Sequence, residues 1–154
     1  MKKGSVLQLL ITCEKFLDSA KRILASKSGN EEDLRTAISR AYYSLYHQTL
    51  LTTKNRYSLD LIDTIEKRKK RRLSRREETQ LSSLDSNFLR SINLHRILPL
   101  TLAKIGESTK SVLLKNYRVL RNQADYDLKL NFNESDVTTY VTAIETLFNE
   151  VKVL

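Results

Sequence analysis

Two short stretches of this sequence hold most of the side chains that could carry out chemistry. The first, ISRAYYSLYH, spans residues 38–47, and the second, LRNQADYDL, spans residues 120–128. Each gathers Arg, Tyr, Asp or His within an otherwise amphipathic helical pattern. Polar groups concentrated in this way predict either a functional site or a buried hydrogen-bonded network. The sequence leaves both alternatives open.

On the first stretch, helical rotation places Arg40, Tyr43 and His47 on one stripe about two turns long, with Tyr42 and Tyr46 beside it. Arg40, Tyr43 and Tyr46 could bind a phosphate. His47 could act as a general base, because only histidine titrates near neutral pH. The alternative is that the tyrosines pack in the core with satisfied hydroxyls, and that His47 packs with them.

On the second stretch, Arg121 and Asp125 are i, i+4 neighbours, so an ion pair is available between them. Asn122 and Tyr126 complete the polar set. Apolar periodicity is lost just after Tyr126, which places the set near the end of a helix. Polar side chains at a helix end can reach both solvent and a ligand.

The elements that position these residues are predicted to be helices. The chain has 154 residues with only three Gly and one Pro, and its common residues favour helix. We expect an all-α bundle of four to five helices forming one domain over residues 1–154. Helical patterns cover 5–26, 31–54, 95–106, 109–126 and a last segment beginning after 133–136, with a weaker pattern over 58–83. In the segment 95–106, His95 should be a cap or a surface residue, and Pro99 is tolerable only in the first turn of a helix.

Caps and apolar stripes support these helices. Asn30, followed by three acidic residues, is the expected cap of the second helix, and residues 133–136 give a similar signal for the last one. The second helix should bury one apolar stripe, and the last helix another. The predicted core residues are Leu34, Ile38, Ala41, Leu45, Val137, Tyr140, Val141, Ile144, Leu147, Phe148 and Val151. The single cysteine, Cys13, should be a buried small hydrophobe.

The chain has a net charge of +9, of which IEKRKKRRLSRREE, residues 65–78, contributes +5 with eight basic and three acidic residues. Lys69, Lys70, Arg71 and Arg72 could hold the phosphates of RNA. No aromatic residue is interleaved to stack on bases, so this contact would not read sequence. The alternative is a solvated, mobile connection between helices.

Several classes of function are disfavoured. No helix places two or three Asp, Glu or His residues at metal-ligand spacing, and no Gly-rich loop could cradle a nucleotide, so we expect no metal and no cofactor. No apolar run approaches the roughly 20 residues of a membrane span. A single cysteine gives no sign of an oxidising compartment. We therefore expect a cytoplasmic protein without a membrane segment.

The two stretches also carry a resemblance. The run LRTAISRAYYSLYHQTLL, then HRILPLTL, then LRNQADYDLKLNFNESDVTTYVTAIETL resembles the HEPN superfamily (higher eukaryote and prokaryote nucleotide-binding domain) over about residues 31–150. It is most similar to small stand-alone prokaryotic members with "AYYxxFH" and "RxxADYD" helices. The resemblance implies an up-and-down helical bundle, usually a homodimer that brings two copies of the second motif together across a cleft.

Many HEPN proteins are metal-independent ribonucleases of toxin-antitoxin or defence systems, and some pair with a nucleotidyltransferase antitoxin. Their motif has Arg, a polar residue, and then His, with four to six residues between the Arg and the His. Arg121 and Asn122 match the first two positions, but Tyr126, with four residues between it and Arg121, stands where His would be. Tyrosine, with a pKa near 10, is a poor base at neutral pH. His47 could replace the missing histidine only if the two helices bring it close to Arg121.

Two hypotheses follow from the resemblance and the charge. One is a dimeric RNA- or partner-binding module with a degenerate ribonuclease motif. The other is an active endoribonuclease toxin that uses Arg121 and His47, with Asn122 and Tyr126 in the same site.

Overall fold

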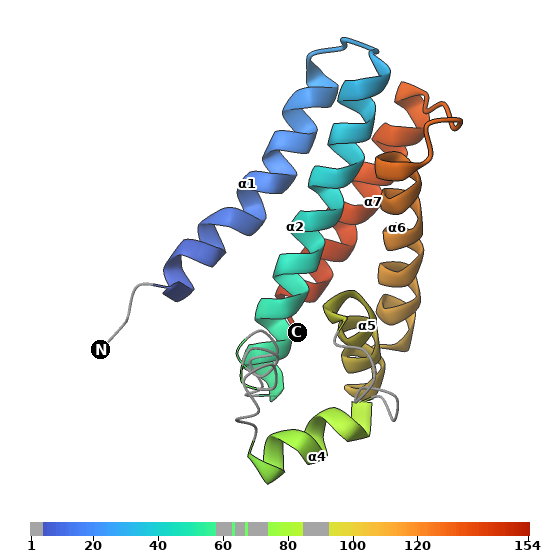
Figure 1. The fold of residues 1–154 in the computed structure, drawn as a ribbon. Helices are drawn as coiled ribbons and strands as arrows, with labels where there is room; N and C mark the ends of the chain where they lie inside the picture. Colours follow the sequence, from blue (N-terminus) through green and yellow to red (C-terminus); the bar gives the residue numbers. More distant parts are fainter. Residues whose placement is uncertain (1–4, 58–62, 64–66, 68–73, 85–92) are drawn as a thin grey trace. The chain divides into compact units, whose positions relative to one another are not determined.

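The computed structural model describes residues 5–57, 63, 67, 74–84 and 93–154. Within these residues there are six α-helices and no strand, which confirms the all-α prediction. The helices are α1 (Ser5–Ala25), α2 (Glu31–Tyr57), α4 (Arg75–Leu84), α5 (Leu94–Lys104), α6 (Ser108–Tyr126) and α7 (Glu134–Lys152) (Figure 1). The expected four to five helices were too few, because the weaker pattern over 58–83 and the short pattern over 95–106 each correspond to a separate helix, α4 and α5.

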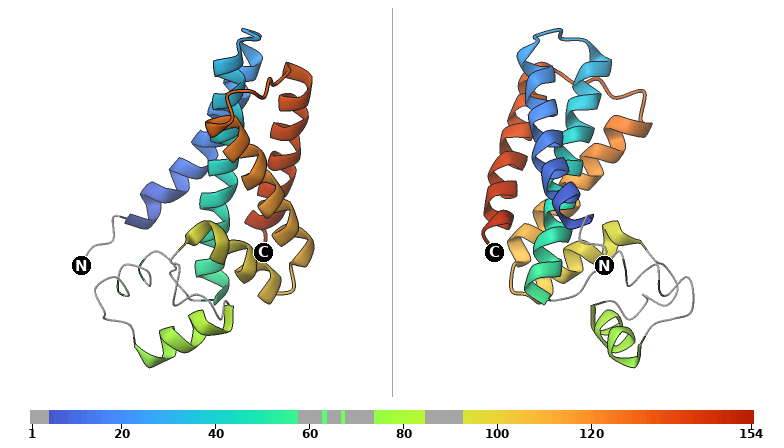
Figure 2. Two further views of the ribbon diagram at one scale, coloured as in Figure 1. Left: turned by 45° about the vertical axis from the view of Figure 1, so that its right-hand side comes forward. Right: turned by 90° about the vertical axis from the view of Figure 1, so that its left-hand side faces the viewer.

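The chain divides into two compact units. The first comprises Met1–Thr49 and Leu114–Leu154, and the second comprises Leu50–Leu113. In the first unit, α1, α2, α6 and α7 alternate in direction along the chain, and α1 contacts α7 (Figures 1 and 2). In the second unit, α4 contacts α5. The single domain expected from the sequence stays a prediction.

In the first unit, the starts of α2 and α7 are capped as expected. The Asn30 side-chain oxygen accepts hydrogen bonds from the backbone N–H groups of Glu32 at 2.8 Å and Asp33 at 3.4 Å. Asn133 caps α7 in the same way, accepting from the backbone of Asp136 at 2.8 Å. Because these side chains satisfy N–H groups that lack a helical acceptor, they fix where α2 and α7 begin.

Both predicted apolar stripes are buried. Leu34, Ile38, Ala41 and Leu45 of α2 face the core, and so does the whole predicted stripe of α7. Cys13 is buried as well, and burial raises the pKa of its thiol to about 11, so it packs as a small hydrophobe. The face of α2 opposite this core is left to carry the polar residues of the first motif.

Helix α5 differs from its prediction in two details. Its cap is Asn93, whose side chain accepts from the backbone N–H of His95 at 3.0 Å, so His95 is not itself the cap. The helix starts at Leu94, which places Pro99 beyond the first turn, where a proline was not expected. Pro99 removes one backbone donor there, and it is buried together with Ile97, Leu98 and Leu102.

Candidate functional site

Arg121 of α6 is held by three side chains. Its Nη2 lies 2.6 Å from Oδ2 of Asp125 and donates to the hydroxyl of Tyr43 at 2.7 Å, while Nη1 donates to Oδ1 of Asn122 at 3.1 Å. The guanidinium carbon also lies 5.0 Å from the centre of the Tyr43 ring and 5.7 Å from that of Tyr126. The side chain is only 12% exposed. Its Nε is buried and has no hydrogen-bond partner among the described residues. Arg121 therefore lies in a mostly buried network that leaves one of its donors unpaired.

The ion pair in this network was available from the sequence, but its link to α2 was not. Asp125 is one helical turn beyond Arg121 on α6, whereas Tyr43 belongs to α2. With Asp125 itself 22% exposed, the pair is largely removed from water. An anion that needed the Arg121 guanidinium would have to displace a carboxylate already in place, which is unfavourable for an ion pair largely removed from water.

His47 lies among aromatic rings. Its ring stacks on Phe16 at 5.8 Å and on Tyr43 at 6.2 Å, and it meets Tyr46 edge-on at 5.2 Å between ring centres. Its Nδ1 is buried and has no hydrogen-bond partner among the described residues. Burial lowers the pKa of His47 below its ordinary value, so the imidazole is neutral at physiological pH. A neutral imidazole can accept a proton.

The three tyrosines of the first motif have different surroundings. Tyr42 and Tyr46 are buried, and burial raises the pKa of both, that of Tyr46 to about 12. Their geometry matches the packing alternative. Tyr43 is only partly buried and lines an open groove. Of the three, Tyr43 alone joins a surface groove to the Arg121 network.

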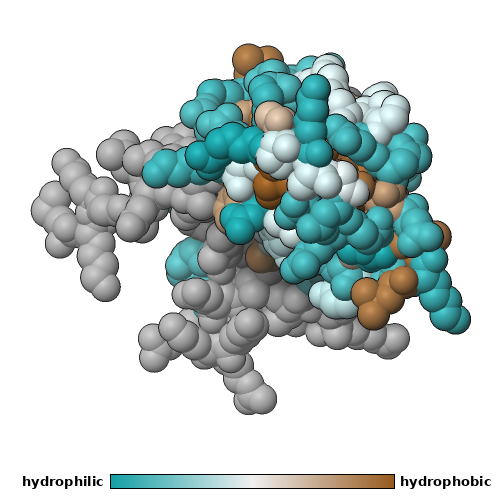
Figure 3. All heavy atoms as spheres, turned by 90° about the horizontal axis from the view of Figure 1, so that it is seen from above, coloured by the Kyte–Doolittle hydropathy of each residue, from teal (hydrophilic) through white to brown (hydrophobic). Residues whose placement is uncertain are grey.

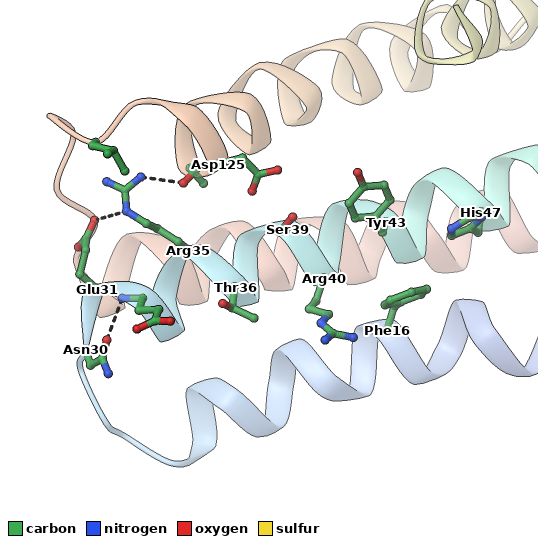
Figure 4. A pocket seen from close by; sticks show the side chains of 13 residues that line it. Phe16, Asn30, Glu31, Arg35, Thr36, Ser39, Arg40, Tyr43, His47 and Asp125 are labelled. Carbon is green, nitrogen blue, oxygen red and sulfur yellow. Dashed lines mark hydrogen bonds and ion pairs between the residues drawn. The ribbon is translucent and has the colours of Figure 1, made fainter.

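The groove extends along the outer face of α2 and has a volume of about 990 Å³. Phe16 of α1 lines one side, and Ala124, Asp125 and Leu128, at and just after the end of α6, line the other (Figure 4). The lining residues from α2 and its cap are Asn30, Glu31, Glu32, Arg35, Thr36, Ser39, Arg40, Tyr43 and His47. Arg40, Tyr43, His47 and Asp125, all predicted from the sequence, thus share one surface.

Asn122 and Tyr126 contact Arg121 but do not line this groove. They line a shallower depression of about 470 Å³ with Val119, Gln123 and Asp127. Neighbouring positions on a helix point about 100° apart, so Arg121 and Asp125 face α2 while Asn122 and Tyr126 face outward. The four residues predicted to be catalytic are therefore not brought onto one surface of a single chain.

Arg121 and His47 meet only through Tyr43. The Tyr43 hydroxyl accepts from Arg121, and its ring stacks on His47. No hydrogen bond or ring contact joins Arg121 directly to His47 in the part of the chain that the structure describes. The condition for His47 to replace the missing histidine is therefore met only indirectly.

Arg35 is a central residue that the sequence did not single out. It is paired with Glu31 at 2.9 Å and donates to the backbone carbonyls of Ala124 at 2.7 Å and Asp127 at 3.1 Å, and also to that of Leu130 (Figure 4). These carbonyls end α6, where a cation offsets both unpaired oxygens and the helix dipole. Arg35 thereby fixes the end of α6 beside the start of α2. The only sequence signal was the favourable order of Glu31 and Arg35 at i, i+4.

Most of the basic segment, including Lys69, Lys70, Arg71 and Arg72, lies outside the described residues. Lys67 is described, and it pairs with Asp63 at 2.9 Å and Glu77 at 3.1 Å. At least one cation of the segment therefore has carboxylate partners of its own.

The described residues contain no group of three or more His, Cys, Asp or Glu side chains placed to hold a metal ion. None of their helices combines the length and apolar character needed to cross a membrane.

Comparison with known proteins adds no relative. No protein-family model, curated protein or solved structure matches this chain.

Proposed function

We propose that this chain is a HEPN-like, dimeric binding module of a prokaryotic toxin-antitoxin or defence system, acting in the cytoplasm on RNA or on a partner protein without cleaving RNA. The proposal rests on the two sequence motifs and on one observation that supports a non-catalytic role. Arg121, which would stabilise charge on a reacting phosphate, is paired with Asp125, and Asn122 and Tyr126 face another surface.

The outward face of α6 supports the binding role. Tyr126 is 74% exposed and Val119, two turns earlier, is 57% exposed, while Leu128 just beyond the helix is 83% exposed. Seen from the end of the first unit where the helix connections lie, the surface is mainly hydrophilic with separate hydrophobic spots (Figure 3). Aromatic side chains such as Tyr126 are enriched at protein interfaces, whose rims are polar. We propose that a second copy of the chain covers this face.

Sedimentation velocity tests the dimer. Tyr126→Asp puts a charge into the proposed interface and should shift the protein to monomer at concentrations where the wild type is dimeric. Asn149→Asp introduces the same charge at an exposed position of α7 and should leave the wild-type state unchanged. A wild type that is monomeric at all concentrations, or equal behaviour of both variants, would exclude this interface.

A second candidate function is metal-independent RNA cleavage by Arg121 and His47. Its specific support is Tyr43, which contacts both residues, and the neutral state of His47, which suits a general base. A partner nucleotidyltransferase or other antitoxin would belong to this candidate as well as to the first.

One assay separates the two candidates. A mixed-sequence RNA is incubated with purified protein in EDTA, and binding is measured on the same samples by gel shift. Cleavage by the wild type that is lost in both Arg121→Ala and His47→Ala, but kept in Lys115→Ala, would establish the nuclease. Lys115 is an exposed cation on the same helix as Arg121, so it controls for loss of charge. Binding without cleavage in the wild type supports the binding module.

The basic segment can be tested in the same gel-shift format. Replacing Lys69, Lys70, Arg71 and Arg72 by Ser should weaken RNA binding and make it less dependent on salt, since each lost phosphate contact lowers the salt slope by about 0.7 for single strands. Unchanged affinity would mean that RNA, if bound, is held elsewhere.

A further inference from the structure

The groove over α2 holds one cation whose charge no neighbouring side chain neutralises. The Arg40 guanidinium lies over the Phe16 ring, 5.5 Å from its centre, on the α1 side of the groove (Figure 4). Arg40 is exposed and has no ion-pair partner in the described part of the chain. A guanidinium stacked on a ring still presents its N–H groups along its edge, where they can bind a planar oxyanion with two parallel hydrogen bonds.

The other charges of the groove decide which anion fits. Three carboxylates line it, of which Glu31 is paired with Arg35 and Asp125 with Arg121. Glu32 lies eight residues before Arg40 on α2, about 12 Å away along the helix axis. One uncompensated cation among three carboxylates favours a ligand with a single negative charge. A dianion would gain little more from Arg40 and would be repelled more strongly by its surroundings.

The aromatic end of the groove indicates what the uncharged part of the ligand should be. Beside Arg40 the lining consists of Phe16, Tyr43 and His47, three rings that stack on or tilt against one another. His47 contributes a neutral ring whose buried Nδ1 has no hydrogen-bond partner among the described residues. Such a wall accepts a flat apolar ring by stacking or edge contact. The Thr36 hydroxyl, one turn before Arg40 on α2, adds a polar group on the side of Arg40 away from His47 (Figure 4).

We propose that the Phe16–Arg40–His47 end of this groove binds a small aromatic monocarboxylate. The carboxylate pairs with the Arg40 guanidinium, and the ring lies against the aromatic wall. This site is independent of RNA, of the outward face of α6 and of dimer formation, so it goes beyond the proposed function and stands or falls separately from it.

The test is calorimetric titration of the purified full chain with five probes. 1-Naphthoate and benzoate have the proposed chemistry. Acetate lacks the ring, 1-naphthalenemethanol lacks the charge, and phenyl phosphate is a dianion near neutral pH. We expect 1-naphthoate to bind most tightly, benzoate next, and each of the other three to bind about tenfold or more weakly than 1-naphthoate.

Three variants locate the site. Arg40→Gln should weaken 1-naphthoate binding about tenfold or more, because it removes the charge. Arg40→Lys should give an intermediate loss, because a point charge replaces a planar fork. Arg22→Gln makes the same change at an exposed arginine of α1 outside the groove and should bind as the wild type does. Circular dichroism should show all three folded, since both arginines are exposed.

The outcomes that overturn the proposal are equally specific. Phenyl phosphate binding as tightly as 1-naphthoate would make the site a phosphate site. Equal binding by 1-naphthalenemethanol would make it a general apolar surface. Arg40→Gln binding like the wild type would place the ligand elsewhere, and a lack of binding by both aromatic carboxylates at millimolar concentration would remove the site altogether.

Discussion

Two arginines link α2 to α6, and they do so in different ways. Arg35, on α2, bonds to backbone carbonyls at and beyond the end of α6 and to the neighbouring Glu31. Arg121, on α6, bonds to the side chains of Tyr43, Asp125 and Asn122. The last backbone carbonyls of a helix lack an intrahelical donor, and Arg35 supplies one. The Arg35 region is therefore structural. The partners of Arg121 are side chains that also line surfaces, so its network can both stabilise the fold and respond to what binds there.

The largest expected effect is in the Arg35 region. Arg35→Ala removes an ion pair and leaves three carbonyls near the α6 end without their donor, so it should lower the free energy of unfolding by about 3 kcal/mol. Urea unfolding followed by circular dichroism measures this change. Lys115→Ala, at an exposed position of α6, should stay within about 0.5 kcal/mol of the wild type. A loss below about 1 kcal/mol for Arg35→Ala would show that water replaces the arginine without difficulty.

The Arg121 network should respond more weakly and in two distinguishable steps. Asp125→Asn leaves a mostly buried guanidinium without its counter-charge and should cost about 2 kcal/mol, whereas Tyr43→Phe removes one hydrogen bond and should cost about 1 kcal/mol. The same unfolding measurement applies. Asp127→Asn is the matched control, because that exposed carboxylate accepts only a local bond from the backbone of Lys129. Equal losses for Asp125→Asn and Asp127→Asn would contradict the importance of the ion pair.

The smallest effect depends on pH. Burial holds the pKa of His47 below the value of about 6.5 that it has in the unfolded chain. As the pH falls below 6.5, the unfolded state therefore binds a proton that the folded state resists, and stability is lost until the pH passes below the folded-state pKa. His47→Phe keeps a ring in the cluster and should abolish this part of the acid-side loss.

Melting temperatures of the wild type and of His47→Phe, measured between pH 8 and pH 5, check the sign. The difference between the two should shift in favour of the variant as the pH falls. A constant difference across this range would mean that the His47 ring is freely protonated within the folded protein.

Local patterns sufficed to predict the helices and the core of the first unit. The cap at Asn30, the stripe from Leu34 to Leu45 and the start of α7 at its Asn133 cap all depend on residues within one or two turns of each other. Such information is contained in the spacing of apolar and capping residues. The position of Pro99 in its helix was predicted wrongly. Pro99 lies among buried apolar residues in the interior of α5 and not at the helix start.

The candidate site was predicted less completely, because its geometry depends on which helix faces which. Spacing alone pairs Arg121 with Asp125 and Asn122 with Tyr126 equally well, and only packing against α2 decides which pair is turned inward. Arg35 was missed for a related reason. Its acceptors are main-chain carbonyls about ninety residues further along the chain, and any amino acid supplies a carbonyl.

The connection between α6 and α7 has a consequence for proteolysis. Lys129 is exposed and lies outside any helix, as trypsin requires. The chain on both sides of it is nevertheless held by hydrogen bonds. The carbonyls of Asp127 and Leu130 accept from Arg35, and the backbone N–H of Phe132 donates to Glu31. A protease must draw several residues into an extended shape before it can cut, and here that would break these bonds. Lys27 lies between α1 and α2. Its backbone N–H donates to the carbonyl of Leu24, which is only three residues away, and no other backbone bond of Lys27 is seen within the described residues. Within the first unit, brief digestion should therefore cut after Lys27 well before it cuts after Lys129.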